Sequence, residues 1–280
     1  MKVCFLIVIY NKQLDKSTSL KTLIDLMSKR KEMAYLRVVN NGPKEILNEL
    51  DYTENIIVDF QQSITNRPLS MIYNDFIKDY DGFDRFIILD DDSKLSKEYI
   101  DRIYSSEVYD LELPKVYNNS NEIISPLLNW KFIDKGRSNL KSSEGFILSV
   151  GSGLVIDKSL LYLFKSLEIL PFNEALSLYG VDSSFFLELR KKNFSKIIIT
   201  SKSYIYHDIS LHGKISNFKK YELYINYALQ MRHYPNLDNF KILSFHILKN
   251  LKNKDFKLLK AMFTIYFKGI HPNSLKHKRF

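Results

Sequence analysis

The sequence cannot form an internal disulfide, because its 280 residues include a single cysteine, Cys4. Cys4 lies in an apolar run, where a small core residue is a simpler interpretation than a reactive thiol. No apolar run approaches the roughly 20 residues that a membrane-spanning helix needs. Residues 1–12 are largely apolar but contain no small-residue cleavage site, which indicates a buried strand rather than a signal peptide. These absences predict a globular protein of a reducing, cytoplasmic compartment.

Acidic residues are scarce in only one part of the chain. The whole sequence has 41 Lys and Arg and 32 Asp and Glu, a net charge of +9. Residues 214–280 contain fourteen basic residues and three acids, a net charge of +11, which leaves −2 for the remainder. This asymmetry predicts an acidic partner for the C-terminal quarter, either phospholipid or nucleic acid.

Short apolar runs alternate with helical patterns over the first 90 residues. The apolar runs are rich in Val, Ile and Phe, as in strands buried on both faces, and cover residues 3–10, 34–40, 54–60 and 85–90. Between them, apolar residues recur at helical spacing over residues 18–31, 43–50 and 66–80. The alternation predicts a parallel sheet, whose ligands bind beyond the carboxyl ends of the strands.

The pattern becomes less regular after residue 120 and then mostly helical after residue 217. Further strands are predicted at residues 122–130, 145–150, 151–156, 196–200 and 203–207, with a helix at about 182–192. We therefore predict two domains, residues 1–215 with the sheet and residues 216–280 as a basic, amphipathic helical extension.

Three successive carboxylates, Asp90, Asp91 and Asp92, directly follow the fourth predicted strand. Neighbouring carboxylates repel one another unless a cation or hydrogen-bond donors offset their charge. One Asp would suffice to cap a helix that begins near Ser96, so capping does not account for three. Mg²⁺ and Mn²⁺ prefer oxygen ligands and commonly share them with phosphates. The triplet therefore predicts a divalent cation bound together with a phosphorylated ligand.

Several short motifs follow one another along residues 3–210. In order, they are the strand end Tyr10-Asn11, VVNNGP (38–43), Asn66 and Asn74, FIILDDDSKLS (86–96), GSGLVI (151–156), YGVDSSFFLELRKKNF (179–194) and YIYHDIS (204–210). Together they resemble the family 2 glycosyltransferases, inverting enzymes with the GT-A nucleotide-sugar fold, and especially their bacterial rhamnosyltransferase-like branch.

The resemblance implies an α/β fold of the GT-A (Rossmann-like) class, with a mostly parallel central sheet and a C-terminal α-helical extension. It implies that Asp182 is the catalytic base and that Asp92 and His207 bind Mn²⁺ or Mg²⁺. The residues that it assigns to the nucleotide-sugar donor are Tyr10, Asn11, Asn40, Asn66, Asn74, Asp90, Asp91 and Ser152.

The sequence departs from the family pattern at four positions. Asn40 stands where Asp is usual, although an amide can still pair with a pyrimidine edge. Pro68 replaces a common Gly, and Val181 and Ser184 replace acids often found beside the catalytic Asp. Asp182 is thus the only carboxylate of its motif.

Two of these residues also have plain structural interpretations. Asp182 would stabilise the first turn of a helix through the helix dipole without any catalytic role. A lone histidine at a strand end, such as His207, is more often structural than a metal ligand. Both alternatives stay open on the sequence.

The basic tail has two compatible interpretations. Phe256, Leu259, Phe263 and Phe267 recur at helical spacing and are expected on one side of a helix. Such helices pack on the catalytic domain with a solvated lysine face. Alternatively, residues 237–280 contact an anionic membrane surface, where each basic residue adds about 1 kcal/mol. With the resemblance, this predicts a peripheral protein at the inner face of the cytoplasmic membrane.

The predicted function is transfer of a sugar from a UDP- or dTDP-sugar to a glycan or glycolipid acceptor of a growing bacterial surface polysaccharide, such as capsule or O-antigen. A sugar-phosphate nucleotidyltransferase is a second possibility, but no Gly-rich, basic loop follows the first strand. A nucleic-acid-binding protein that uses the basic tail is a third. The Asp triplet would repel nucleic-acid phosphates, so no nucleic acid partner is expected.

Overall fold

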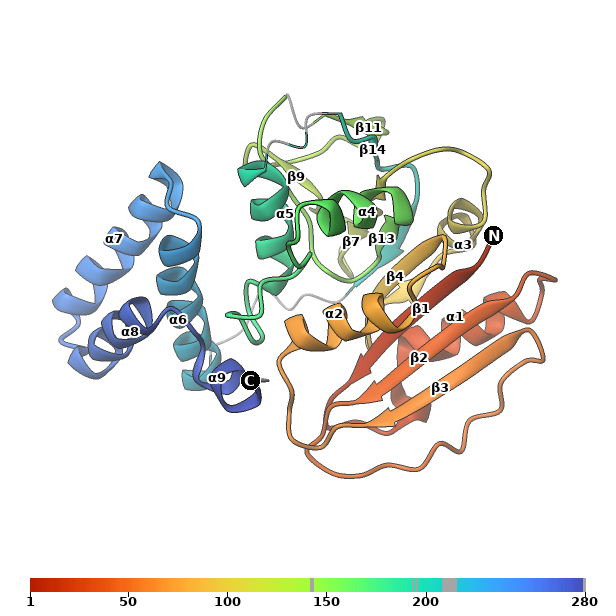
Figure 1. The fold of residues 1–280 in the computed structure, drawn as a ribbon, viewed down its shortest axis with the longest axis horizontal. Helices are drawn as coiled ribbons and strands as arrows, with labels where there is room; N and C mark the ends of the chain where they lie inside the picture. Colours follow the sequence, from red (N-terminus) through yellow and green to blue (C-terminus); the bar gives the residue numbers. More distant parts are fainter. Residues whose placement is uncertain (142–143, 193, 195, 208–215, 279–280) are drawn as a thin grey trace. The chain divides into compact units, whose positions relative to one another are not determined.

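The structure is a computed structural model that describes residues 1–141, 144–192, 194, 196–207 and 216–278 (Figure 1). The chain divides into two compact units, each described below by itself. Unit 1 comprises Met1–Asn66, Tyr73–Pro171 and Lys192–Ile209, and unit 2 comprises Arg67–Ile72, Phe172–Lys191 and Ser210–Phe280. Unit 2 thus draws on three separate parts of the chain, and the boundary after residue 215 stays a prediction.

Unit 1 is built on an eight-stranded sheet with the order β11-β14-β6-β13-β4-β1-β2-β3. Its strands are β1 (Val3–Ile9), β2 (Ala34–Asn40), β3 (Ile56–Gln62), β4 (Arg85–Asp90), β6 (Leu111–Glu112), β11 (Asn139–Leu140), β13 (Leu154–Asp157) and β14 (Ile199–Thr200). Strands β1 to β4 form a continuous parallel block, whereas β13 is antiparallel to β4. The predicted parallel sheet is therefore confirmed over the first 90 residues, and their carboxyl ends share one edge (Figure 1).

Helices cover both faces of this sheet. On one face, α1 (Thr18–Met27) and α3 (Lys97–Ile103) bury Leu20, Leu23 and Ile100 against alternate residues of the parallel strands. On the other face lies the unit 1 part of α2 (Leu69–Asp79), residues 73–79, in which the Phe76 ring centroid is 5.9 Å from that of Phe86 in β4. Strands β1, β2 and β4 are thus buried on both sides, which explains their continuous apolar sequences, whereas the edge strand β3 is only partly buried.

A second, four-stranded sheet has the order β5-β15-β7-β8. Its strands are β5 (Lys94–Leu95), β15 (Tyr204–Tyr206), β7 (Lys115–Tyr117) and β8 (Ile123–Ser125), and a three-stranded sheet contains β9 (Leu127–Leu128), β10 (Lys131–Phe132) and β12 (Ile147–Leu148). The remaining elements of unit 1 are the 3-10 helix η1 (Leu14–Lys16) and α4 (Lys158–Ser166). The antiparallel pairing of β15 with β5 brings residue 207 beside the segment that follows the Asp triplet.

The helix predicted over residues 43–50 is wrong, because this segment contains no helix or strand. Side chains from two neighbouring strands bind its carbonyl groups instead. Asn40 Nδ2 donates to the Lys44 carbonyl oxygen at 2.7 Å, and Gln62 Nε2 donates to that of Ile46 at 2.5 Å. These two hydrogen bonds satisfy carbonyl groups of a segment that is not helical. In this segment Ile46 is buried in the core beside the sheet.

Unit 2 is helical in its described residues, with α5 (Val181–Lys191), α6 (Asn217–His233), α7 (Leu237–Lys252), α8 (Phe256–Lys268) and α9 (Pro272–His277). Helix α8 buries Leu258, Leu259, Met262 and Ile265, two of which pack on Tyr224 and Ala228 of α6. The spacing predicted that Leu259 shares one face with Phe256, Phe263 and Phe267. This prediction is wrong, because the three Phe side chains are exposed whereas Leu259 is buried. Leu259 points into the core because it shares a face with Met262, one turn along α8.

The C-terminal helices hold the segment that precedes α5. Asn173 Nδ2 donates to the hydroxyl group of Tyr234, the residue that follows α6, at 3.0 Å. Next to α9, the His271 amide donates to the Ala175 carbonyl oxygen at 2.9 Å. Helices α6 and α9 thus belong structurally with residues 172–191. No helix of the described ranges combines the length and apolarity that crossing a membrane requires.

Candidate functional site

The carboxyl ends of β1, β2 and β4 meet because β1 lies between the other two strands. Beyond β1 and β2 the chains remain paired, as the Asn41 amide donates to the Ile9 carbonyl oxygen and the Asn11 amide to that of Gly42, both at 2.7 Å. The Asp triplet follows β4 at the same edge. The polar residues that follow these three strands therefore lie at the edge where ligands of a parallel sheet bind.

Hydroxyl groups at the start of α1 hold the turn that carries the Asp triplet. Ser17 Oγ donates to the Asp91 carbonyl oxygen at 2.9 Å while it caps α1. Ser19 Oγ donates to the carbonyl oxygens of Asp90 and Ser93, and the Ser93 amide donates back to Ser19 Oγ at 3.0 Å. These hydrogen bonds hold the backbone of the turn in place, and with it the positions from which the three carboxylates extend.

Asp90, Asp92 and His207 form what we call the Asp-Asp-His cluster. Each offers one ligand atom, and these atoms lie within 4.8 Å of one another. His207 Nδ1 is 3.0 Å from Asp92 Oδ1, and His207 Nε2 is 3.9 Å from Asp90 Oδ2. The cluster unites the two residues predicted to bind the metal with Asp90, which had been assigned to the donor.

The donor set of this cluster suits a divalent cation. Two ligand atoms about 2.1 Å from an ion and at right angles are about 3 Å apart, which is close to the His207–Asp92 separation. The side chains of Asp90 and Asp92 are 44% and 43% exposed, so a bound ion could also contact a ligand from solution. The two carboxylate oxygens are ligands that suit Mn²⁺ and Mg²⁺ alike.

The surroundings of Asp92 favour its ionised form. Burial raises its pKa, but the hydrogen bond and charge of His207, with the charge of Lys12, outweigh this effect and leave the pKa below its ordinary value. An ionised carboxylate at neutral pH is the form that binds a metal ion.

Asp91 has a different partner from its two neighbours. Its Oδ1 accepts a hydrogen bond from Lys12 Nζ at 2.5 Å. Burial raises the pKa of Asp91 above its ordinary value, and the ammonium group of Lys12 opposes this shift only in part. Lys12 thus supplies part of the positive charge that the triplet predicted.

Ser152 and Ser93 connect the cluster to the central sheet. Ser152 Oγ accepts from the Asp90 amide at 2.9 Å and lies 2.6 Å from Ser93 Oγ. Ser93 Oγ in turn lies 3.0 Å from His207 Nδ1. The prediction named Ser152 but missed Ser93 and Lys12. Their positions, directly after the triplet and just beyond the first strand, were the available signals.

The asparagines assigned to the donor lie in different surroundings. Asn40 is buried, and its side chain binds Lys44, Gln62 Oε1 at 2.6 Å and the Gly42 amide at 3.1 Å. It therefore shapes the loop after β2. Asn66 Oδ1 accepts from Asn41 Nδ2 at 3.4 Å, and Asn74 is buried in α2. The Tyr10 side chain is 50% exposed beyond β1.

Asp182 lies in unit 2, in the first turn of α5, and is partly buried. The chain enters this helix through Gly180, whose φ is +81°. A Cβ atom at Gly180 would lie 1.9 Å from Asn226 Oδ1 of α6, so glycine is required for both conformation and space. The Ser184 amide bonds the Gly180 carbonyl oxygen at 2.8 Å. The contact with α6 fixes where α5, and hence Asp182, begins.

Solved structures of S. aureus TarS are similar to this chain. TarS 1–349 matches over 98% of this chain and 82% of its own, with 14% sequence identity and a TM-score of 0.52. Another TarS structure matches over 86% of this chain with 16% identity and a TM-score of 0.51, and this chain spans 41% of its length. TarS 1–349 in complex with UDP-GlcNAc matches over 90% of this chain and 73% of its own, with 15% identity and a TM-score of 0.48.

At these identities the likeness concerns the fold. With the strand order, it confirms the predicted α/β, GT-A fold class. Neither a protein-family model nor a curated protein sequence matches the chain. The resemblance to glycosyltransferase family 2 therefore depends on the ordered sequence motifs alone.

Proposed function

We propose that this chain is a metal-dependent, inverting glycosyltransferase of the rhamnosyltransferase-like branch of family 2. It transfers a sugar from a UDP- or dTDP-sugar to a hydroxyl group of a growing, lipid-linked bacterial surface polysaccharide. The observation that carries the proposal is the Asp-Asp-His cluster, which lies at the carboxyl end of a parallel strand in a GT-A fold.

In this proposal the Asp-Asp-His cluster would hold a Mn²⁺ or Mg²⁺ ion. When bound, the ion supplies positive charge beside the diphosphate of the donor. Around it, the chain's own residues orient the donor. Tyr10 offers an exposed ring face to the nucleobase. Asp91, held in direction by Lys12, accepts hydrogen bonds from the nucleoside.

Asp182 is the proposed general base. Its carboxylate takes the proton of the acceptor hydroxyl group as that oxygen attacks the anomeric carbon. The bond from the anomeric carbon to the diphosphate oxygen breaks on the opposite face, and the nucleoside diphosphate leaves with the electron pair. A single displacement of this kind inverts the anomeric configuration.

Thermal melting with donor and metal tests the proposed function. We expect a UDP- or dTDP-sugar to raise the Tm by roughly 5 °C at a concentration a hundredfold above its Kd, which corresponds to about 2.7 kcal/mol. The rise should require Mn²⁺ or Mg²⁺ and disappear in EDTA. Because TarS binds UDP-GlcNAc, that sugar is the first donor to test. Stabilisation by RNA, with none by any nucleotide sugar, would contradict the proposal.

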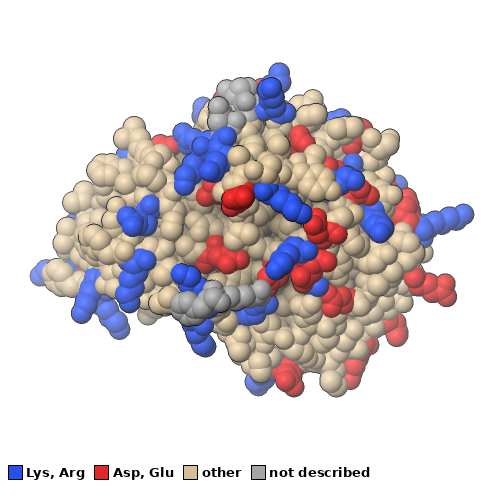
Figure 2. All heavy atoms as spheres, viewed as in Figure 1, with Lys and Arg blue, Asp and Glu red and all other residues tan. Residues whose placement is uncertain are grey.

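The proposal includes peripheral contact of residues 237–280 with an anionic membrane surface at the inner face of the cytoplasmic membrane. Its support is the surface of α7 and α8, where large apolar side chains are exposed, among them Phe240, Phe245, Leu248, Phe256, Phe263 and Phe267. In Figure 2 the face drawn over these helices carries Lys and Arg and few acids. Apolar side chains among lysines are typical of interfacial helices.

Substitution within the full chain tests this contact, because removing residues 237–280 would strip the core of unit 2. We expect Phe263→Ser with Phe267→Ser to weaken sedimentation with phosphatidylglycerol vesicles at least about tenfold, since each ring would lose part of its roughly 1.5–3 kcal/mol of burial. The matched control is Trp130→Ser with Phe132→Ser, which removes two rings of similar exposure from unit 1. Equal binding by both variants would refute the contact.

A further inference from the structure

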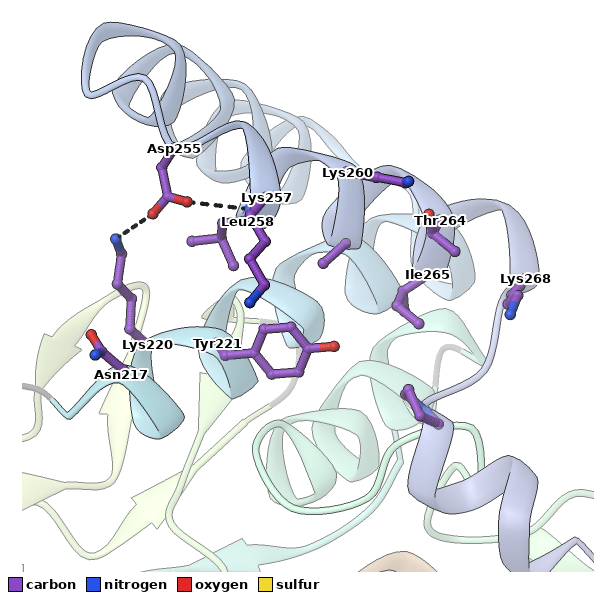
Figure 3. Close-up of a pocket in the computed structure, with 12 residues that line it drawn as sticks. Asn217, Lys220, Tyr221, Asp255, Lys257, Leu258, Lys260, Thr264, Ile265 and Lys268 are labelled. Atoms are coloured by element: carbon purple, nitrogen blue, oxygen red, sulfur yellow. Dashed lines mark hydrogen bonds and ion pairs between the residues drawn. The ribbon is translucent and has the colours of Figure 1, made fainter.

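A cavity of about 650 Å³ opens in unit 2 between α6, α8 and the start of α9 (Figure 3). This volume lies within the range of small-molecule sites. Its chemistry is set by Lys220 and Tyr221 of α6 and by Lys257, Lys260, Thr264 and Lys268 of α8. The cavity belongs to unit 2 alone and is distinct from the Asp-Asp-His cluster of unit 1.

The cavity has an excess of three positive charges, from four lysines and one carboxylate. Asp255, which caps α8, accepts from Lys220 Nζ at 2.9 Å and is thereby paired. Among the residues that the structure describes, Lys257, Lys260 and Lys268 form no ion pair. All three lie along one side of α8, and Lys257 and Lys260 are three residues apart, a spacing at which like charges on a helix are destabilising.

The walls of the cavity are fixed by the core beneath them. Leu258 and Ile265 line its floor and are almost fully buried. Leu258 also packs on Tyr224 of α6. In Figure 3 the Lys257 side chain extends from α8 toward the Tyr221 ring. The core therefore holds the backbone of α8, from which the lysine side chains and the hydroxyl group of Thr264 extend.

We propose that this cavity binds the phosphate or diphosphate group of a phosphorylated ligand. Lysine ammonium groups bind phosphate as point charges, and the three lysines that form no ion pair with the described residues provide positive charge for a doubly charged group. The group could belong to a phospholipid or to a soluble sugar phosphate. If the proposed transferase function holds, the site would bind the phosphate of a lipid-linked acceptor, but binding itself does not depend on transfer.

Titration with inorganic pyrophosphate in EDTA tests the site without donor, metal or turnover. We expect saturable binding whose Kd rises at least tenfold in the full-length variant Lys257→Ala, Lys260→Ala, Lys268→Ala. The matched control is Lys241→Ala, Lys249→Ala, Lys252→Ala, which removes the same charge from exposed positions on α7 and should change the Kd less than twofold. If the triple variant melts early, Lys260→Glu alone should still raise the Kd about tenfold.

Equal weakening in the pocket and control variants, or no saturable binding to the unmodified chain, would overturn the proposal. Vesicles then identify the source of the phosphate. If the pocket variant no longer binds phosphatidylglycerol vesicles while the control variant still does, and pyrophosphate displaces the unmodified chain from these vesicles, the ligand is a lipid headgroup. If only pyrophosphate binding is lost, it is a soluble phosphate. Because the titration contains no nucleotide sugar, failure of the transferase proposal would leave its result unchanged.

Discussion

Replacing Asp92 with Ala should lower the rate of sugar transfer about 10³-fold, equivalent to roughly 4 kcal/mol of transition-state stabilisation. The variant should also lose the Mn²⁺ dependence of donor binding. The reason is that Asp92 contributes the ionised carboxylate nearest His207, so two ligand atoms would remain. The measurements are the initial rate of transfer and donor affinity, each with Mn²⁺ and with EDTA.

A charge-matched control separates the metal effect from the loss of one negative charge. Asp81 forms an exposed ion pair with Lys165 at 2.9 Å, and Asp81→Ala should leave the rate within about twofold of the original. Full activity of Asp92→Ala in EDTA would end the metal hypothesis, and the Asp-Asp-His cluster would then be structural.

Replacing Asp182 with Asn should lower the transfer rate about 10²- to 10⁴-fold, or roughly 3 to 5 kcal/mol, because a positioned base contributes that much. Donor and metal binding should survive, since the amide keeps the size of the carboxylate and only its capacity to take a proton is lost. If Asp182 acted only in the first turn of α5, the substitution would cost about 1 kcal/mol of stability or less and leave the rate nearly unchanged.

The matched control for Asp182 is Asp238, which also lies in the first turn of a helix of unit 2. Asp238→Asn should have no effect on transfer and a comparable, small effect on melting. A normal rate for Asp182→Asn would remove it from the mechanism. Loss of donor affinity in that variant would reassign it to donor binding.

Three strands of the parallel block, β1, β2 and β4, were predictable because they are buried on both faces and their sequences are continuous apolar runs. Residues 3–9, 34–40 and 85–90 became strands with nearly the predicted bounds. The segment 43–50 misled the prediction, since its helical spacing reflects single buried contacts such as Ile46 rather than a helix. Distant side chains that bind its backbone, such as that of Gln62, leave no local signal.

The candidate site was partly predictable for a related reason. The Asp triplet could be recognised as a candidate site from its charge and from its position after a predicted strand. Contact of His207 with Asp92 depends on the pairing of β5 with β15, and β5 is only two residues long. Pairing between such short segments follows from the packed fold rather than from local propensity. The resemblance to a known family, not the pattern, pointed to His207.

The discontinuity of unit 2 has a consequence for protein engineering. A chimaera that exchanged only the C-terminal quarter between two such proteins would pair Tyr234 and His271 of one parent with residues 173–175 of the other. A recombination that preserves the interior of unit 2 must exchange residues 67–72, 172–191 and 210–280 together. The smallest exchangeable module therefore includes Asp182, so a graft of the basic helices would also replace the residue proposed to deprotonate the acceptor.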